Sequence, residues 1–579
     1  AVDAAFDVVA GPEAETRFLD DLDESTRSAL AAGPLGDPAS APVWDYPEDG
    51  TVLPAHLSAP LFQWDRAAIA PNCRVYRLVL RGEGFVLTVF TTGTGFQPDA
   101  LSWQRLANPF GAAIQLELAC KAEASREMPL HVAAPRAIRA VDAGLRGAVY
   151  YRQIQTNDIR RIEPGDSEPS SLFGLPVTVA TCHGCHTTSA DGARIAFTVW
   201  NDFDPRKGLA ATRTPLPEDL TALSPLRWTF MSFHPRGHRV AAISYGRMWL
   251  ADVTDGLPGG ASSLGDVAQA TVRGCLVDDA CAATGCTPGE DGCLAPAVPS
   301  FSPDGSLLVY VARTAKPGCA PCQQPGCTDC QGALDWNYTG GDLMRIPWDD
   351  DAGTFGTPTL LWPRGDTPGT ATIAYPTWSP DSRWIVAARG PTTARFAPDT
   401  VFFRIDPGSG EAVRLERGTP TNGAAGTRAG VQNGYPRFTP FVEGGHYWLL
   451  FHSTRPYGAV RKKQLWAMAI DVDAAAGGDP SHPAFHVPGQ SLITDNIQGE
   501  WARSPCLGRG ASCDDSASCC LGLTCDAARD GGRRCQAAAG CSLPAEACDD
   551  DSDCCASEPS FVCRATWAGS RRVCQLPMP

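Results

Sequence analysis

A short turn pattern recurs along the middle of this chain, and it limits the fold more than any other feature. Its clearest copy is Phe-Ser-Pro-Asp-Gly at 301–305, followed directly by the apolar stretch 306–310. In such a unit a strand ends at Ser or Thr, Pro presets φ for the turn, Gly supplies a positive φ, and an apolar strand returns. Further copies occupy 189–197, 233–240, 378–386 and, more loosely, 438–450. The pattern predicts repeated antiparallel hairpins and therefore an all-β architecture.

The aromatic-Ser-Pro-Asp-Gly turn resembles the mark of the TolB-type (WD40-like) β-propeller family, and the resemblance covers residues 143–505. It implies four-stranded blades around a central channel, with the first strand of each blade innermost. Counting the units predicts a six-bladed propeller. Five blades are expected to start near Thr181, Phe230, Pro299, Pro376 and Pro436. The sixth would join 497–502 to 147–152 and 159–162, which closes the ring and removes open sheet edges.

Residues 182–186 read Cys-His-Gly-Cys-His, the attachment signature of c-type haem. Cys182 and Cys185 would add across the two haem vinyl groups, and His186 would be the proximal iron ligand. A disulfide, an unmodified thiol pair, or a metal-binding or redox dithiol are the alternatives. Zinc lacks an obvious second ligand pair at a matching spacing, and the βαβ context of a thioredoxin-like motif is missing. We therefore expect one covalent haem c on the innermost strand of a blade, near the channel mouth.

The other axial position of the iron decides between electron transfer and catalysis, because a second protein ligand favours the former. Aligning the blade turns places Met231 opposite His186 in the neighbouring blade. Met231 is therefore the candidate distal ligand, and its thioether would raise the reduction potential. Histidines near other blade turns are expected to be structural: His234, His238, His446 and His452. His183 lies inside the binding loop and could approach only the haem of another copy, which leaves a homo-oligomer or filament as an open alternative.

Cysteine usage points to an oxidising compartment. Setting Cys182 and Cys185 aside leaves 22 of the 24 cysteines, and these fall into even local groups. Such groups suggest local disulfides. They comprise Cys73 with Cys120, four cysteines at 275–293, four at 319–330, and twelve at 506–574. The third group, Cys319, Cys322, Cys327 and Cys330, has paired Cys-x-x-Cys spacing and could form disulfides or bind zinc.

The twelve terminal cysteines form two copies that both open with the same C-x₆-C-x₅-C-C frame. They resemble cystine-knot (knottin-type) modules, at 506–536 and 537–579. That resemblance implies pairing of the first cysteine with the fourth, the second with the fifth and the third with the sixth; the residues alone allow fifteen connectivities per module. Modules this small need their bridges in place of a core. They would serve as a stable cap or as a binding module.

The N-terminal part is expected to contain two segments. Residues 1–49 are acidic and rich in Pro and Ala, and they suggest an extended arm with one weak helical pattern at 18–30. Residues 50–142 alternate apolar and polar positions between turns and resemble a fibronectin type III-like β-sandwich. We expect that sandwich to be a spacer or adhesion module.

Bulk properties exclude some classes of function. The net charge of −16 argues against nucleic-acid binding. The sequence contains no run of 18 apolar residues, so it predicts no transmembrane helix. The N-terminal residues lack the basic start and the apolar stretch of a signal peptide, which suggests a mature terminus. We find no Gly-x-Ser-x-Gly elbow and no His-Glu-x-x-His motif.

Together these features predict a six-bladed propeller with an N-terminal sandwich and two disulfide-rich modules, located outside the bacterial cytoplasm: extracellular, on the cell surface or in the periplasm. We expect a monohaem c-type cytochrome that passes electrons to a redox partner protein or an extracellular acceptor. Two alternatives remain: a haem peroxidase-like enzyme with an open distal site, and a non-enzymatic binding or assembly protein. A propeller by itself does not decide between them.

Overall fold

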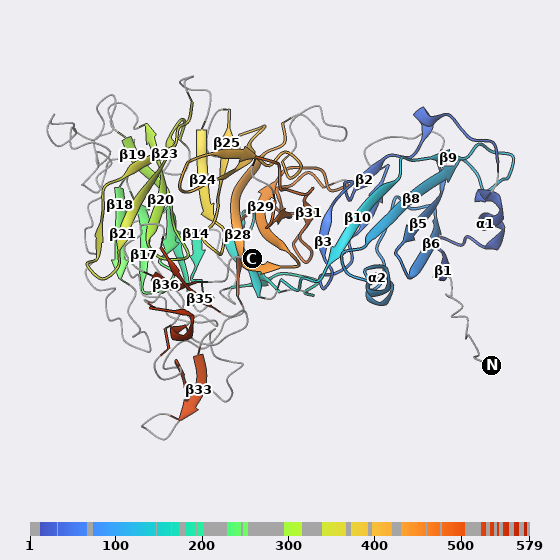
Figure 1. Cartoon of the computed structure of the whole chain (residues 1–579). Helices are drawn as coiled ribbons and strands as arrows, with labels where there is room; N and C mark the ends of the chain where they lie inside the picture. Colours follow the sequence, from blue (N-terminus) through green and yellow to red (C-terminus); the bar gives the residue numbers. More distant parts are fainter. Residues whose placement is uncertain are drawn as a thin grey trace, which may run out of the picture. The chain divides into compact units, whose positions relative to one another are not determined.

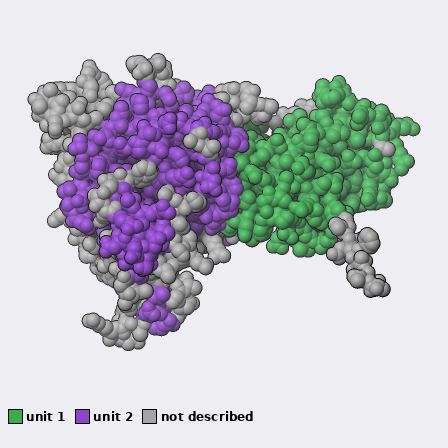
Figure 2. Space-filling view, in the orientation of Figure 1, with its two compact units in different colours: residues 1–145, 456–461, 482–488 green, residues 146–455, 462–481, 489–579 purple. Residues whose placement is uncertain are grey.

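The chain forms two compact units in the computed structural model (Figures 1 and 2). Unit 1 comprises residues 1–145, 456–461 and 482–488, and unit 2 the remainder. The structure describes residues 12–31, 33–65, 73–145, 147–163, 165–172, 181–190, 192, 194–201, 229–244, 247–252, 294–314, 338–365, 372–391, 397–419, 430–458, 460–474, 477–503, 523–527, 533–537, 541–542, 548–554, 561–566 and 572–575.

Unit 1 contains two sheets that pack through aromatic side chains, with Trp64 of the smaller sheet 5.7 Å from Tyr76 of the larger one. The larger sheet has the order β1 (Glu13–Phe18), β6 (Phe85–Thr91), β5 (Val75–Arg81), β8 (Ala113–Lys121), β10 (Arg136–Val141), β3 (Val52–Pro54), with β9 (His131–Val132) beside β8. The smaller contains β2 (Trp44–Tyr46), β4 (Phe62–Trp64) and β7 (Gly95–Phe96). Two helices, α1 (Glu24–Leu30) and α2 (Ala100–Leu106), a short 3₁₀ turn at Pro38–Ser40 and the short strand β31 (Phe485–His486) complete the unit.

Unit 1 has the two sheets expected of a β-sandwich, but a fibronectin type III-like arrangement is not shown, and the limits of the unit differ from those expected. Residues 13–46 are part of unit 1, whereas the sequence suggested an extended arm over residues 1–49. β1 pairs in parallel with β6, and Phe18 stacks on Phe90 at 5.2 Å. Asp23 caps α1 by accepting a hydrogen bond from the Ser25 amide, which confirms a helix within the weak pattern at 18–30. The pairing of β10 with β3 is also parallel, so the larger sheet departs from an all-antiparallel arrangement.

Unit 2 confirms the predicted all-β propeller architecture, because small antiparallel sheets follow one another along the chain (Figure 1). In the described residues these sheets are β14 (Thr181–Thr188) with β15 (Ile195–Asn201); β16 (Phe230–Phe233), β17 (Arg239–Ser244) and β18 (Arg247–Asp252); β19 (Leu294–Phe301), β20 (Leu307–Thr314), β21 (Asp342–Asp349), β22 (Thr354–Phe355) and β23 (Thr359–Trp362); β24 (Thr372–Trp378), β25 (Ile385–Gly390), β26 (Val401–Ile405) and β27 (Ala412–Arg414); β28 (Asn433–Glu443), β29 (His446–Ser453) and β30 (Gln464–Asp471); and β32 (Asn496–Ala502), β11 (Ala148–Gln153), β12 (Asp158–Ile162) and β13 (Ser170–Ser171).

The first strand of each of these sheets lies against the first strand of the next. Contacts run from β14 to β16, β19, β24, β28 and β32, and β32 contacts β14 again. The returning strand β32 pairs antiparallel with β11, so the last described strand of the ring completes the sheet that begins near residue 148. Such closure leaves none of these inner strands at an open edge of the ring.

The recurring Ser-Pro-Asp turn is built by local hydrogen bonds. The Ser302 hydroxyl accepts from the Leu307 amide at 3.0 Å and donates to Asp304, whose carboxylate accepts from the Ser306 amide. Gly305 has a φ of 71°, a value that suits glycine. Ser379 accepts from the amide five residues later in the same way, at 2.8 Å. The turn therefore satisfies its own polar groups by local hydrogen bonds and joins the first two strands of a blade.

A second repeated bond joins neighbouring blades. The Ser232 hydroxyl accepts from the Phe301 amide of the next inner strand at 3.0 Å, and the Thr377 hydroxyl accepts from the Phe438 amide at 3.4 Å. The equivalent residue of the returning strand β32 is Glu500, which accepts from the Thr188 amide at 2.8 Å. A carboxylate thus replaces Ser or Thr where the ring closes.

The disulfides that the structure describes agree with the predicted local groups. Cys73 bonds to Cys120 in unit 1. In the second terminal module Cys548 bonds to Cys563 and Cys554 to Cys574, which are the second-to-fifth and third-to-sixth pairings of a cystine knot. Hairpins complete the two modules: β33 (Leu523–Ala527) with β34 (Arg533–Ala537), and β35 (Val562–Ala565) with β36 (Arg572–Gln575). The cysteine groups at 275–293 and 319–330 lie outside the described residues.

Candidate functional site

A small cavity lies among the inner strands of unit 2, with about 280 Å³ of space between atoms that includes open solvent. Its walls come from four strands that are far apart in the sequence, β14, β16, β28 and β32, and from the residue before β16. The lining residues are Cys185, His186, Thr229, Phe230, Met231, Tyr435, Arg437, Gln498, Gly499 and Glu500. Three of the four predicted haem-site residues, Cys185, His186 and Met231, therefore line one cavity. The side chain of Cys182, the fourth, is outside the described part of the chain.

The cavity follows from a bulge that recurs in the inner strands. Cys185 has a φ of 48°, and Tyr435 and Gln498 occupy the same position of their strands with φ values of 54° and 55°. Left-handed backbone is uncommon for residues with a side chain, and a bulge re-aims the side chains beside it. All three bulge residues line the cavity. The second cysteine of the predicted haem motif is thus placed by a feature of the whole propeller.

His186 has the hydrogen-bond arrangement of a metal-ligating histidine. Its side chain is buried, and its Nε2 lies 3.2 Å from the carbonyl oxygen of Tyr150. A carbonyl can only accept, so Nε2 carries the proton and Nδ1 has a lone pair; Nδ1 is buried and has no hydrogen-bond partner in the structure. Ligating histidines usually donate their other ring N–H to a carbonyl or carboxylate in this way. Burial lowers the pKa of His186, partly opposed by Glu500, and this keeps the ring neutral and able to bind a metal.

Two sulfur atoms accompany this imidazole. Met231 is 3% exposed, and Cys185 is a thiol in the structure. Thiolate, thioether and imidazole are ligands for soft or borderline metals, including haem iron. The donor set in the cavity therefore fits the predicted group.

An ion pair forms the polar side of the cavity. Arg437 Nε lies 3.2 Å from Glu500 Oε1, and both side chains are largely buried, at 15% and 10% exposure. The other carboxylate oxygen of Glu500 accepts from Thr188 on β14. Glu500 therefore connects β28, β32 and β14 and neutralises the guanidinium beside the cavity.

Two aromatic rings, those of Phe230 and Tyr435, also line the cavity. Tyr435 stacks on Tyr375 with ring centroids 4.0 Å apart, and Phe230 lies 5.9 Å from both rings. Gln498 Nε2 donates to the Tyr435 hydroxyl at 2.6 Å, while Gln498 Oε1 is buried without a partner. Burial raises the pKa of Tyr435 well above its ordinary value, so the phenol stays neutral. The lining therefore combines aromatic and sulfur-bearing side chains with a buried ion pair and a buried amide.

The sequence analysis did not identify Tyr435, Arg437, Gln498 or Glu500. These four residues do not belong to a recognisable sequence motif. None of them is a glycine, the residue that would usually indicate a positive φ in the sequence. Only an alignment of every inner strand on its following turn could have found them, since Tyr435 and Gln498 then fall on the position of Cys185 and Tyr375.

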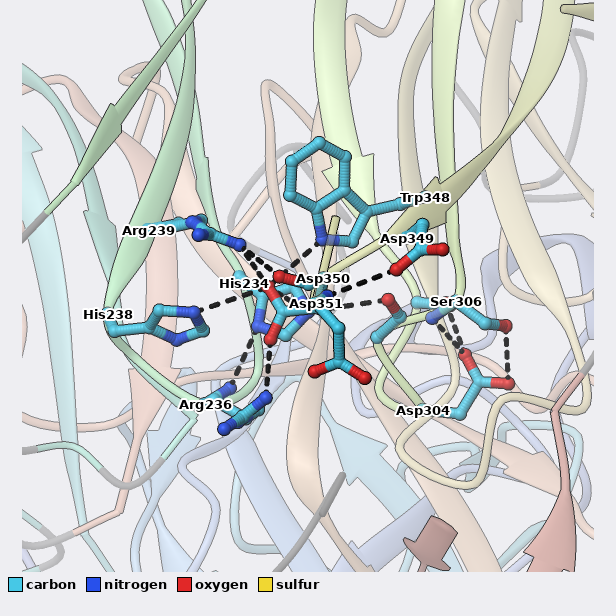
Figure 3. A network of polar contacts seen from close by, with 12 residues as sticks. His234, Arg236, His238, Arg239, Asp304, Ser306, Trp348, Asp349, Asp350 and Asp351 are labelled. Carbon is cyan, nitrogen blue, oxygen red and sulfur yellow. Dashed lines mark hydrogen bonds and ion pairs between the residues drawn. The ribbon is translucent and has the colours of Figure 1, made fainter. Parts of the chain in front are cut away.

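A second polar cluster centres on Asp350 (Figure 3). His238 Nε2 lies 3.2 Å from Asp350 Oδ1 and His234 Nε2 lies 3.7 Å from it, a grouping that could suggest a metal site. The carboxylate is already paired, however, with Arg236 at 2.6 Å and Arg239 at 2.7 Å. These cations hold the Asp350 oxygens, so the cluster is structural, as expected for His234 and His238.

His234 itself shows why a cation is disfavoured there. Its Nε2 lies 3.3 Å from the Gly305 carbonyl, and its Nδ1 accepts from the Arg236 amide. Burial lowers the pKa of His234 to about 3. Both ring nitrogens are therefore engaged by the backbone of the turn and the ring remains neutral.

Comparison with known proteins adds little to this geometry. No known family matches the chain, and no curated protein does. Solved structures similar to it include a putative TolB from Agrobacterium tumefaciens (14% identity, 61% of this chain and 96% of that chain, TM-score 0.27). Others are a chain of the nidogen–laminin complex (12%, 61% and 97%, 0.33) and Kuenenia stuttgartiensis hydrazine synthase (11%, 51% and 70%, 0.25). At these TM-scores the propeller assignment rests on the sheet topology described above. In the described residues no helix is long and apolar enough to cross a membrane.

Proposed function

We propose that this chain is a secreted or cell-surface monohaem c-type cytochrome that moves single electrons. The observation that carries the proposal is His186, a neutral, buried imidazole with one nitrogen on a backbone carbonyl and the other without a partner. It lines one cavity with Cys185 and Met231. Cys182 and Cys185 would hold haem c covalently, His186 would supply one axial ligand and Met231 the other. The bound haem would supply an iron centre that gains or loses one electron.

The residues around the cavity would tune that change. Phe230 and Tyr435 supply apolar lining, and a buried site with a thioether ligand favours the reduced state. Glu500 compensates the charge of Arg437, so the site carries no net charge from this pair. The space that the described residues leave here is far smaller than a porphyrin, so haem would have to extend beyond these residues.

Location and partners follow from the same proposal. Haem attachment to c-type proteins takes place outside the bacterial cytoplasm, and the disulfides Cys73–Cys120, Cys548–Cys563 and Cys554–Cys574 require an oxidising compartment. The electron partner would be a redox protein or an extracellular acceptor.

Optical spectra of two methionine variants test the proposal. The protein is produced in a bacterial host that attaches haem, and wild type is expected to be low-spin and unchanged by carbon monoxide. Met231→Leu should become high-spin and bind carbon monoxide, whereas Met248→Leu, an equally buried methionine of β18 outside the cavity, should behave as wild type. A high-spin, ligand-binding wild type would instead support the peroxidase-like alternative. A colourless protein would support a binding or assembly role.

A further inference from the structure

Arg404 on β26 has a buried guanidinium that lies over the Trp384 ring but has no counter-charge within ion-pair distance in the described residues. The residue is 3% exposed, and its Nε and Nη1 are buried with no hydrogen bond. Arg455 is the other arginine in the buried part of the described chain, and it bonds to the Gly418 carbonyl at 2.8 Å and to Ser453. A buried charge without a counter-charge is costly, so an unpaired guanidinium indicates a missing anion.

The surroundings of Arg404 add further positive charge and a second unpaired donor. Its guanidinium carbon lies 4.1 Å from the Trp384 ring centroid, and that of Arg383 lies 5.5 Å from the same ring. The indole N–H of Trp384 is also buried without a partner. The Arg383 side chain makes a long hydrogen bond, 3.4 Å, to the Val472 carbonyl and also interacts with the Tyr447 hydroxyl.

The acids nearest to these cations are engaged elsewhere. Asp381 accepts from Ser379, from the Arg383 amide and from the Tyr447 hydroxyl. Asp479 accepts from the Arg417 and Ser481 amides. No carboxylate of the described residues lies within ion-pair distance of Arg404. Burial and the like charge of Arg383 lower the pKa of Arg404, which agrees with a net positive site.

We propose that Arg404, Arg383 and Trp384 form a binding site for an oxyanion, either a tetrahedral sulfate or phosphate group or a planar carboxylate. A guanidinium offers a fork of N–H donors that matches both, and an adjacent indole N–H adds a third donor direction. The site lies at a blade turn and is separate from the channel cavity, so it is independent of the haem proposal.

Binding of simple anions tests this site. Sodium sulfate, phosphate and acetate are titrated at constant ionic strength, with calorimetry and thermal unfolding as readouts; the preferred anion distinguishes the tetrahedral from the planar source. Wild type should bind one anion at millimolar or lower concentration and melt at higher temperature with it. Arg404→Met should lose at least tenfold in affinity, and Trp384→Phe severalfold. Arg345→Met, an arginine of β21 that bonds to Thr359 and the Pro407 carbonyl, should bind as wild type.

Stability without anion separates a binding role from a structural one. Because Arg404→Met removes an uncompensated buried charge and keeps the apolar stem, it should unfold at the same or a higher temperature than wild type in anion-free buffer. If Arg404→Met melts several degrees lower there, or if wild type and Arg404→Met gain equally from every anion, the proposed site is wrong.

Discussion

Glu500 offers a direct test of how the ring closes, because its carboxylate contacts two neighbouring inner strands. The change Glu500→Gln keeps the size of the side chain and removes the charge that faces Arg437 at 3.2 Å. The Glu500 and Arg437 side chains are only 10% and 15% exposed, so water screens their interaction weakly. Leaving one partner of a buried pair uncompensated costs about 3–5 kcal/mol. Since glutamine can still accept from the Thr188 amide, we expect the lower end, ~3 kcal/mol.

Hydrogen exchange followed by mass spectrometry measures this loss where it occurs. A loss of ~3 kcal/mol raises the population of the locally open state by roughly a hundredfold. Peptides covering β11, β14 and β32 should therefore exchange about a hundred times faster in Glu500→Gln, while peptides of β20 should be unchanged. Adding Arg437→Met removes the stranded charge and should restore at least half of the protection.

Glu416→Gln is the matched control for Glu500→Gln. The Glu416 side chain is 68% exposed and lies 3.9 Å from Arg414, so its loss should change exchange by no more than about threefold, equivalent to roughly 0.6 kcal/mol. Exchange in Glu500→Gln that rises less than tenfold at β11 and β32 would refute the reasoning that this carboxylate holds the closing strand.

Three further predictions concern stability. Burial lowers the pKa of His234 from 6.5 to about 3, so between these pH values the unfolded chain binds a proton that the folded chain does not. The free energy of unfolding should therefore fall by up to ~5 kcal/mol as the pH drops from 6.5 to 3. In His234→Gln the free energy of unfolding should fall less over the same acid titration. Ser302→Ala removes the acceptor for the Leu307 amide and should cost ~1–3 kcal/mol in thermal unfolding, whereas the exposed Ser409→Ala should cost less than ~0.5 kcal/mol. Cys554→Ser opens the Cys554–Cys574 bridge and should make residues 541–575 sensitive to limited proteolysis without affecting unit 2 strands.

Local features of the sequence predicted much of the fold, because their cause is local. The Ser-Pro-Asp turn satisfies its own polar groups, so residues 302–307 specify a hairpin wherever they occur. The spacing of the terminal cysteines carried enough information for the pairings Cys548–Cys563 and Cys554–Cys574. The position of the Cys-x-x-Cys-His motif on an inner strand also followed from its distance to the next turn, and β14 confirms it.

Non-local pairing explains what the sequence analysis missed. Residues 13–18 join unit 1 only because they pair with β6, about seventy residues later, and no local pattern marks a parallel partner. The cavity residues Tyr435, Gln498 and Glu500 depend on a bulge without glycine and on ring closure between β32 and β14. Such positions become visible only when all inner strands are compared.

Covalent haem on β14 is the central claim, and the mass of the intact protein tests it most directly. Protein matured in a host that attaches haem should gain the mass of one haem, survive acid–acetone extraction with its colour, and give the pyridine haemochrome spectrum of a c-type haem. Cys182→Ser with Cys185→Ser should lose all three. A matured wild type of unmodified mass, colourless and with Cys182 bonded to Cys185, would contradict the account.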